Sequence, residues 1–170
     1  MIRSLGGKTP SIHPTAFISE AAYIVGDVEI GEGSSIWPGT VIRGDTGKIT
    51  IGKFTNVQDN SVLHGDDDVV IGDNVTIGHR VMCHGRNIGN RVLIGNGAIL
   101  NDGVLVGEES VIGSGSMILE NMDIPEKSIV VGMPGRVRGT VKEKHVDMID
   151  RISAGYAIKA RKYKSEGNLE

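Results

Sequence analysis

Aliphatic residues recur at every sixth position along most of this chain, and this period restricts the possible folds more than any other feature. Isoleucine stands at every sixth residue from Ile12 to Ile42. The register slips between Ile42 and Ile88, and aliphatic residues then continue at the same spacing to Val130. A six-residue period fits neither an α-helix, with 3.6 residues per turn, nor a simple amphipathic strand, with a period of two.

A period of six is typical of a parallel β-helix, in which each six-residue unit forms one short strand and one turn. Three units close a triangular coil, so each aliphatic side chain points inward and stacks on its counterpart in the next coil. Glycine and other small residues recur between the aliphatic positions, where tight corners need a positive φ or close backbone approach. The period resembles that of the hexapeptide-repeat, left-handed β-helix proteins and predicts a mainly β fold.

Composition agrees with this fold. The chain of 170 residues contains 25 glycines, whereas aromatic residues make up only 4% of it. Such a chain cannot build a bulky aromatic core and must stack small aliphatic side chains instead. A β-sandwich with frequent turns is the competing interpretation, but its strands would alternate over longer runs and carry a more aromatic core.

The pattern changes near Val141. Apolar residues then recur at three- and four-residue steps from Val146 to Tyr163, with charged residues between them, which indicates an amphipathic α-helix. We therefore expect a β-helix domain with the functional site at residues 1–139 and a C-terminal helix at residues 140–170. The helix should cover apolar surface on its own β-helix or on a neighbour, and residues 131–139 should be the connection.

Charge and cysteine content exclude several classes of function. The net charge of −3 argues against a nucleic-acid partner, which selects a basic surface. No apolar run is long enough for a membrane span, and the N-terminus lacks the apolar segment of a secretory signal. Cys83 is the only cysteine, so no intramolecular disulfide can form and a reducing, cytoplasmic setting is expected.

Two histidines occupy equivalent positions in successive coils. His64 and His84 are each the second residue of the third unit in their coils. Such positions stack about 4.8 Å apart, the spacing of neighbouring strands, and alternation points both side chains outward from one face. Two imidazoles at that separation can share one metal ion. Arg43 and Asn101 hold the same position one coil before and one coil after, so a solvated polar column is the simpler alternative.

His79 breaks this alignment. It is the third residue of the second unit in its coil, on another side of the triangle or at its corner. A neighbouring chain related by a threefold axis could bring His79 to the ion more easily than its own chain could. The geometry therefore predicts a homotrimer with the metal site between subunits. The outward-pointing Trp37 would then lie at the trimer interface or pack on the surface.

The donor set indicates the chemistry of this site. Three histidine nitrogens with one open position are the ligands of a catalytic zinc ion. Imidazole also suits Fe(II) and Co(II), and the sequence leaves this choice open.

Three segments carry a resemblance to a known family. VIRGD at residues 41–45, NVQDNSVLHG at residues 56–65 and IGHRVMCHG at residues 77–85 resemble the signature segments of the γ-class carbonic anhydrases, and the resemblance extends over about residues 12–135. It implies a metal-dependent enzyme that reversibly hydrates CO2 to bicarbonate through metal-bound hydroxide. The implied partners are copies of the chain itself and the small substrate, with no nucleic acid and no membrane.

The resemblance also implies roles for individual residues. His64 and His84 of one subunit and His79 of the next would bind the metal. Arg43 and Asp45 would form a structural ion pair across the subunit interface. The remaining implied site residues are the two amides, Gln58 to hydrogen-bond near the metal-bound water and Asn56 to order that site.

Two departures from the family pattern bear on the rate. Thr46 stands where the best-studied members carry a glutamate after the Arg-x-Asp motif. Those members also carry a long acidic loop with a proton-shuttling glutamate after the first metal histidine, whereas only residues 65–70 stand here. Asp66, Asp67 and Asp68 are expected to form a solvated turn, so proton transfer could limit turnover.

Three other functions fit the same scaffold. A hexapeptide-repeat acyltransferase would use a single histidine base and a protruding loop that holds acyl-CoA; the three histidines at metal spacing argue against it. A non-catalytic metal-binding trimer is compatible with Thr46. A thioesterase or another hydrolase could use the same metal-bound water.

Overall fold

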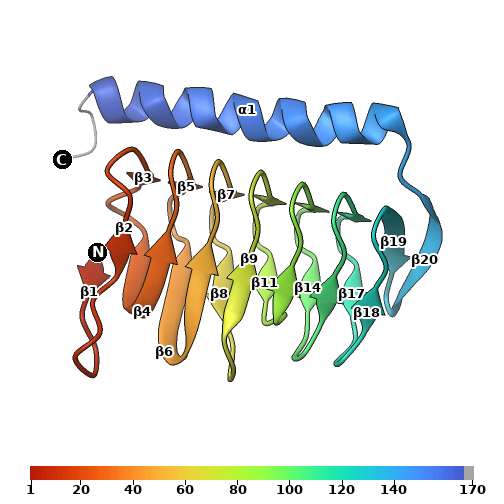
Figure 1. The fold of residues 1–170 in the computed structure, drawn as a ribbon, viewed down its shortest axis with the longest axis horizontal. Coiled ribbons are helices and arrows are strands. Elements are labelled where there is room, and N and C mark those ends of the chain that lie inside the picture. Colours follow the sequence, from red (N-terminus) through yellow and green to blue (C-terminus); the bar gives the residue numbers. More distant parts are fainter. Residues whose placement is uncertain (167–170) are drawn as a thin grey trace.

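The computed structural model describes residues 1–166 and shows a mainly β solenoid of about seven turns followed by one long helix (Figure 1). Three parallel faces form the coil, as the six-residue period predicts. Strands β4 (Tyr23–Ile30) and β6 (Val41–Ile51) turn a corner and join two of the faces into one sheet of 12 strands.

The first of these two joined faces, here called the histidine face, carries His64 and His84. It consists of the first parts of β4 and β6 together with β1 (Ile2–Arg3), β8 (Val62–His64), β11 (Met82–Cys83), β14 (Ile99–Leu100) and β17 (Met117–Ile118). The second, here called the polar face, consists of the last parts of β4 and β6 together with β2 (Ser11–Ile12), β9 (Val69–Ile71), β12 (Asn87–Ile88), β15 (Leu105–Val106) and β18 (Asp123–Ile124).

The remaining sheet has eight strands and is here called the helix face. It consists of β3 (Phe17–Ile18), β5 (Ser35–Ile36), β7 (Asn56–Val57), β10 (Thr76–Ile77), β13 (Leu93–Ile94), β16 (Val111–Ile112), β19 (Ser128–Gly132) and β20 (Gly135–Thr140). The last two strands pair antiparallel, so residues 131–139, expected to be a plain connection, form most of a hairpin at the end of the coil.

The six-residue positions build the core. Ile36, Ile77 and Leu100 have no exposed surface, and the register pairs Ile94 with Ile112 in the next coil. This confirms the predicted stacking of inward aliphatic side chains, which removes apolar surface from water.

Two different backbone needs govern the corners. Gly31 follows an inward isoleucine, and a Cβ there would lie 2.6 Å from the carbonyl oxygen of Gly52 in the next coil. The left-handed conformation occurs two residues after such a glycine. Gly33, two residues after Gly31, has a φ of 66°, and Asn74, two residues after Gly72, has a φ of 56°. Glycine after the aliphatic residue therefore serves close approach, and asparagine can supply the positive φ.

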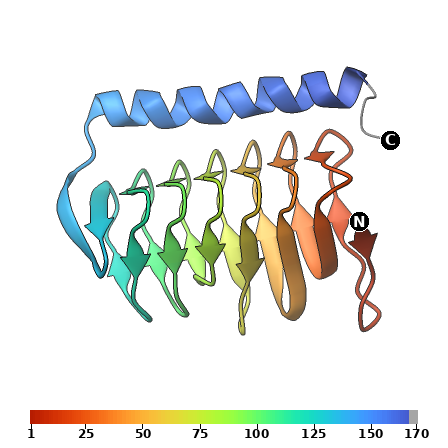
Figure 2. The same ribbon diagram turned by 180° about the vertical axis from the view of Figure 1, so that it is seen from behind.

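Helix α1 (Glu143–Glu166) runs back along the coil and covers the helix face (Figures 1 and 2). Trp37 is only 6% exposed because Tyr156 and Ala160 of α1 pack on it beside Phe17. The helix therefore covers its own β-helix, which was one of the two expected possibilities, and Trp37 belongs to this contact. Residues 167–170, the end of the expected helical segment, lie outside the described residues. Within residues 1–166, no helix has both the length and the apolar character that crossing a bilayer requires.

Candidate metal centre

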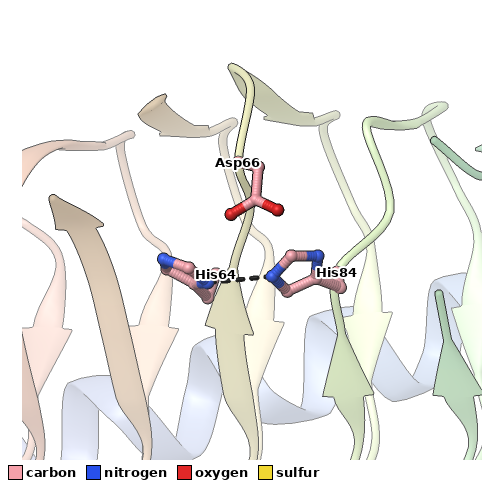
Figure 3. Close-up of side chains that lie close together, drawn as sticks. All are labelled: His64, Asp66 and His84. Atoms are coloured by element: carbon pink, nitrogen blue, oxygen red, sulfur yellow. Dashed lines mark hydrogen bonds between the residues drawn. The ribbon is translucent and has the colours of Figure 1, made fainter. Parts of the chain in front are cut away.

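His64 and His84 lie side by side on the histidine face. Strands β8 and β11 pair in parallel with Leu63 opposite Cys83, so the two histidines that follow these residues leave the sheet next to each other. Nδ1 of His64 lies 2.8 Å from Nε2 of His84, and their ring centroids are 4.9 Å apart (Figure 3). The register also places Arg43 beside His64, as the period predicts.

The geometry of this pair fits a shared metal ion. Two nitrogens bound at about 2.0–2.1 Å to one tetrahedral ion lie about 3.3 Å apart, so the 2.8 Å separation needs only a small side-chain rotation. The side chains of His64 and His84 are 12% and 17% exposed. The pKa of His84 is lowered, first because desolvation disfavours the charged ring and next because His64 lies beside it. A neutral ring is the form that binds metal.

Each of the three predicted ligand histidines contacts a carboxylate. Nε2 of His64 lies 3.0 Å from Oδ1 of Asp45, and Nδ1 of His79 lies 3.0 Å from Oδ2 of Asp59. Nδ1 of His84 contacts Asp102. A carboxylate on one ring nitrogen fixes the tautomer and orients the other nitrogen toward a metal. Sequence reasoning missed the roles of Asp59 and Asp102, although each lies about one coil from its histidine.

His79 lies apart from the pair, in the turn after β10 at the corner between the helix face and the histidine face. Its side chain is 45% exposed, and its backbone N–H donates to Oδ1 of Asn96 at 3.0 Å. The ligand atoms that cluster around His64 and His84 do not include those of His79. One chain therefore does not bring the three histidines together.

The two predicted amides lie on the same side as His79. Nε2 of Gln58 donates to Oδ1 of Asn56 at 3.0 Å, and Nδ2 of Asn56 donates to Oγ1 of Thr76 at 2.9 Å. Gln58 and His79 line one cavity of about 310 Å³, to which Tyr156 of α1 also contributes. The predicted site residues thus form two half-sites: one holds the His64–His84 pair with Arg43 and Asp45, and the other holds His79, Gln58 and Asn56.

Arg43 and Asp45 form an ion pair within one chain, with 2.6 Å between Nη1 and Oδ2. Burial acts to raise the pKa of Asp45, but hydrogen bonds from Arg43, from its own backbone and from His64 outweigh it and hold that pKa below its usual value. Asp45 therefore stays charged and links the arginine to His64. Pairing across a subunit interface stays a prediction.

Asp66 belongs to an exposed turn, as expected, but its carboxylate is directed at the histidine pair. Ligand atoms of His64, Asp66 and His84 all lie within 4.8 Å of one another. Figure 3 shows the carboxylate above the gap between the two rings. The sequence predicts that Asp66 lies near the site, in a solvated turn, but it does not predict that the carboxylate approaches the two histidines.

The chain resembles hexapeptide-repeat proteins and carbonic anhydrases of known sequence. Residues 9–44 and 87–120 match the family described as bacterial transferase hexapeptide, six repeats. The chain is 40% identical to the carbonic anhydrase of Geobacillus kaustophilus, over 97% of this chain and 92% of that protein.

Two further proteins show the range of the resemblance. The chain is 35% identical to gamma carbonic anhydrase 1, mitochondrial, of Arabidopsis thaliana, over 94% of this chain but only 61% of the plant protein's length. A crystal structure of a hexapeptide transferase family protein from Anaplasma phagocytophilum superposes with a TM-score of 0.93 at 36% identity, covering 96% of this chain and 98% of the other.

Proposed function

Because this chain belongs to the γ-class carbonic anhydrase family of hexapeptide-repeat proteins, we propose that it reversibly hydrates CO2 to bicarbonate. The observation that carries this proposal is the division of the site into two half-sites within one chain. Each half-site holds part of a ligand set that becomes whole when a second copy supplies the other part. We therefore propose a homotrimer with its metal sites between subunits.

The surface of the histidine face supports assembly. One outward column on this face is apolar from coil to coil, and the register aligns its members directly. The column consists of Tyr23, Val41, Val62, Met82, Ile99 and Met117. Tyr23 and Met82 are 37% and 42% exposed in the single chain. The other four members are half-buried. An apolar column that reaches the surface in this way supports an interaction surface, and it runs beside the column that carries His64 and His84.

The donor atoms define which residues would hold the metal. His64 and His84 of one subunit, with His79 of the next, would supply three imidazole nitrogens to Zn(II), Fe(II) or Co(II). Such an ion lowers the pKa of a bound water to about 7 and so supplies a nucleophile for CO2. The carboxylates of Asp45, Asp59 and Asp102 would keep the rings in the binding tautomer.

Gln58 is oriented to direct the reacting water. Asn56 donates from Nδ2 to Thr76, which leaves its Oδ1 to accept the hydrogen bond from Nε2 of Gln58. This chain of bonds fixes the amide of Gln58 and leaves its Oε1 to accept a hydrogen bond from water or from the bicarbonate hydroxyl. Gln58 therefore positions the nucleophile, and the proton released in hydration passes to solvent or buffer.

A hexapeptide-repeat acyltransferase is the second candidate, because the superposed Anaplasma protein is described as a hexapeptide transferase family member. An acyltransferase would transfer an acyl group from acyl-CoA without a bound metal. Metal analysis of the purified protein, followed by an acetyl-CoA consumption assay on metal-free protein, separates the two functions.

The test of the proposed function is CO2 hydration by protein loaded to full occupancy with Zn(II), Fe(II) or Co(II). We expect activity above buffer, its loss in His84→Ala together with the metal, and a slower reaction with retained metal in Gln58→Ala. Removal of one preorganised amide that hydrogen-bonds the reacting group costs about 10²–10³-fold in other enzymes. If fully loaded protein gives no hydration with any of the three metals, the enzyme assignment fails and a non-catalytic metal-binding trimer becomes the better account.

A further inference from the structure

We propose that Asp66 completes a metal-binding set with His64 and His84 inside a single chain, so that each subunit can capture a divalent ion before it meets its partner. The inference rests on the proposed function, because that function assigns His79 of the next subunit as the ligand in the assembled site. Asp66 would then hold the position that His79 takes over on assembly.

His64, Asp66 and His84 already lie close together in one chain. Ligand atoms of His64, Asp66 and His84 lie within 4.8 Å of one another, and the two histidine nitrogens are already 2.8 Å apart. The Asp66 carboxylate lies over the gap between the rings, where both nitrogens are within reach (Figure 3). Closing the set calls for a small rotation of the histidine pair and a rotation of the exposed Asp66 side chain.

Asp66 lies in a short turn between β8 and β9. Gly65 directly follows β8, and a Cβ there would lie 2.5 Å from Cγ2 of Val69. A larger residue would press on the buried side chain of Val69, so glycine favours this tight turn between β8 and β9. The short turn therefore keeps Asp66 above the histidine pair, whereas a longer loop would carry it away.

The carboxylates around the histidine pair differ in what they already contact. Asp45 is engaged by Arg43 and His64, and Asp102 contacts His84. Within residues 1–166, the carboxylate of Asp66 makes no side-chain hydrogen bond or ion pair, although it lies within 4.8 Å of a ligand atom of each histidine. It is therefore the acid that can turn to an ion without losing another contact.

The chemistry of the set supports capture followed by exchange. Two histidines and one carboxylate are a ligand set that holds catalytic zinc and non-haem Fe(II) in other proteins. A carboxylate offsets one unit of the ion's charge, whereas a neutral imidazole offsets none. When His79 of the next subunit takes the place of Asp66 as a ligand, the assembled site would become more positive. A single subunit could bind the metal ion before it assembles.

The experiment measures Co(II) affinity by titration calorimetry in the chain of 170 residues, with the visible absorption of bound cobalt as a second readout. The variants are His79→Ala, His79→Ala with Asp66→Asn, and His79→Ala with Asp67→Asn. Asp67 is the matched control because it is the next residue in the same exposed turn and lies outside the cluster.

We expect His79→Ala to bind cobalt at least about tenfold more weakly than the unaltered chain, a change of about 1.4 kcal/mol. Adding Asp66→Asn should weaken binding at least tenfold further and change the absorption spectrum, and Asp67→Asn should do neither. The expectation holds whether or not His79→Ala assembles, because the proposed set lies within one chain.

Two results would overturn the inference. One is the absence of cobalt binding in His79→Ala whose circular dichroism matches that of the unaltered chain. The other is equal affinity with and without Asp66→Asn. Failure of the proposed function would appear separately, as absent CO2 hydration by the fully loaded, unaltered protein, which these affinities do not measure.

Discussion

The histidine face and the polar face are built from the same six-residue repeat, yet their outward surfaces differ. The outward position before each inward aliphatic residue is apolar in six successive coils of the histidine face, from Tyr23 to Met117. The corresponding column of the polar face is mixed and mostly polar. It consists of Ser11, Glu29, Thr50, Val70, Asn87, Leu105 and Asp123.

This difference shows that the inward and the outward residues of the repeat are under different constraints. The inward residues of both faces are equally buried, as Ile42 and Ile51 show, because every coil must close around the same core. The outward residues instead match what lies next to them outside the chain, which is either solvent or another subunit. An apolar column beside the two proposed metal ligands indicates a surface that another subunit covers, whereas the mixed column suits solvent.

The largest expected effect is the loss of assembly when a charge enters the histidine face. Met82→Asp should prevent trimer formation, because it would bury an unpaired carboxylate between subunits. Val70→Asp is the matched control on the polar face, since Val70 is 45% exposed and Met82 42%. Sedimentation should give monomers for Met82→Asp and the parent species for Val70→Asp. Equal behaviour of the two variants would remove the distinction between the faces.

Breaking an ion pair should have a larger effect on the histidine face than on the polar face. The side chains of Arg43 and Asp45 are 47% and 22% exposed in the single chain, and the proposed assembly would bury them. Arg43→Ala should then weaken assembly by about 3–5 kcal/mol, the effect of breaking a buried pair, while far-UV circular dichroism stays unchanged. Lys48 pairs with Glu29 at 2.8 Å on the polar face, and Lys48→Ala should change stability by no more than about 1 kcal/mol.

Concentration-dependent sedimentation measures the loss of assembly in Arg43→Ala, and urea unfolding measures the change of stability in Lys48→Ala. A fully trimeric Arg43→Ala protein of ordinary stability would contradict the interface role of Arg43.

The smallest expected effect is on the pH dependence of metal-free stability. The pKa of His84 is lowered by desolvation and by His64, so the unfolded chain binds the proton more readily. Stability should therefore fall as pH drops below about 6.5, the ordinary value. The pKa of Lys48 is raised by Glu29, so its contribution is lost only as pH rises beyond 10.5.

Urea unfolding of the metal-free protein between pH 5 and 8 tests this prediction, with His84→Ala as the comparison. The variant should show a flatter profile over that range. A profile as steep in His84→Ala as in the parent would assign the acid sensitivity to other groups.

The core and the histidine pair could be predicted from the sequence because one period governs both. Burial imposes an aliphatic residue on every coil, and counting from that residue aligns His64 with His84. The position of Asp66 above the histidine pair could not be predicted, because it depends on how the turn at Gly65 folds and not on the period. The burial of Trp37 depends on where α1 packs, and the repeat carries no information about that.

The central claim is that each complete site contains residues of two chains, and subunit mixing tests it most directly. His79→Ala retains the His64–His84 pair, and His64→Ala retains His79 with Gln58. If equal amounts of the two inactive variants are co-expressed and mix at random in a trimer, about one quarter of the interfaces unite the two intact half-sites. We predict CO2 hydration at about one quarter of the parent activity per chain. Full activity in either variant alone, or no recovery in mixed trimers confirmed by mass spectrometry, would contradict a site shared between subunits.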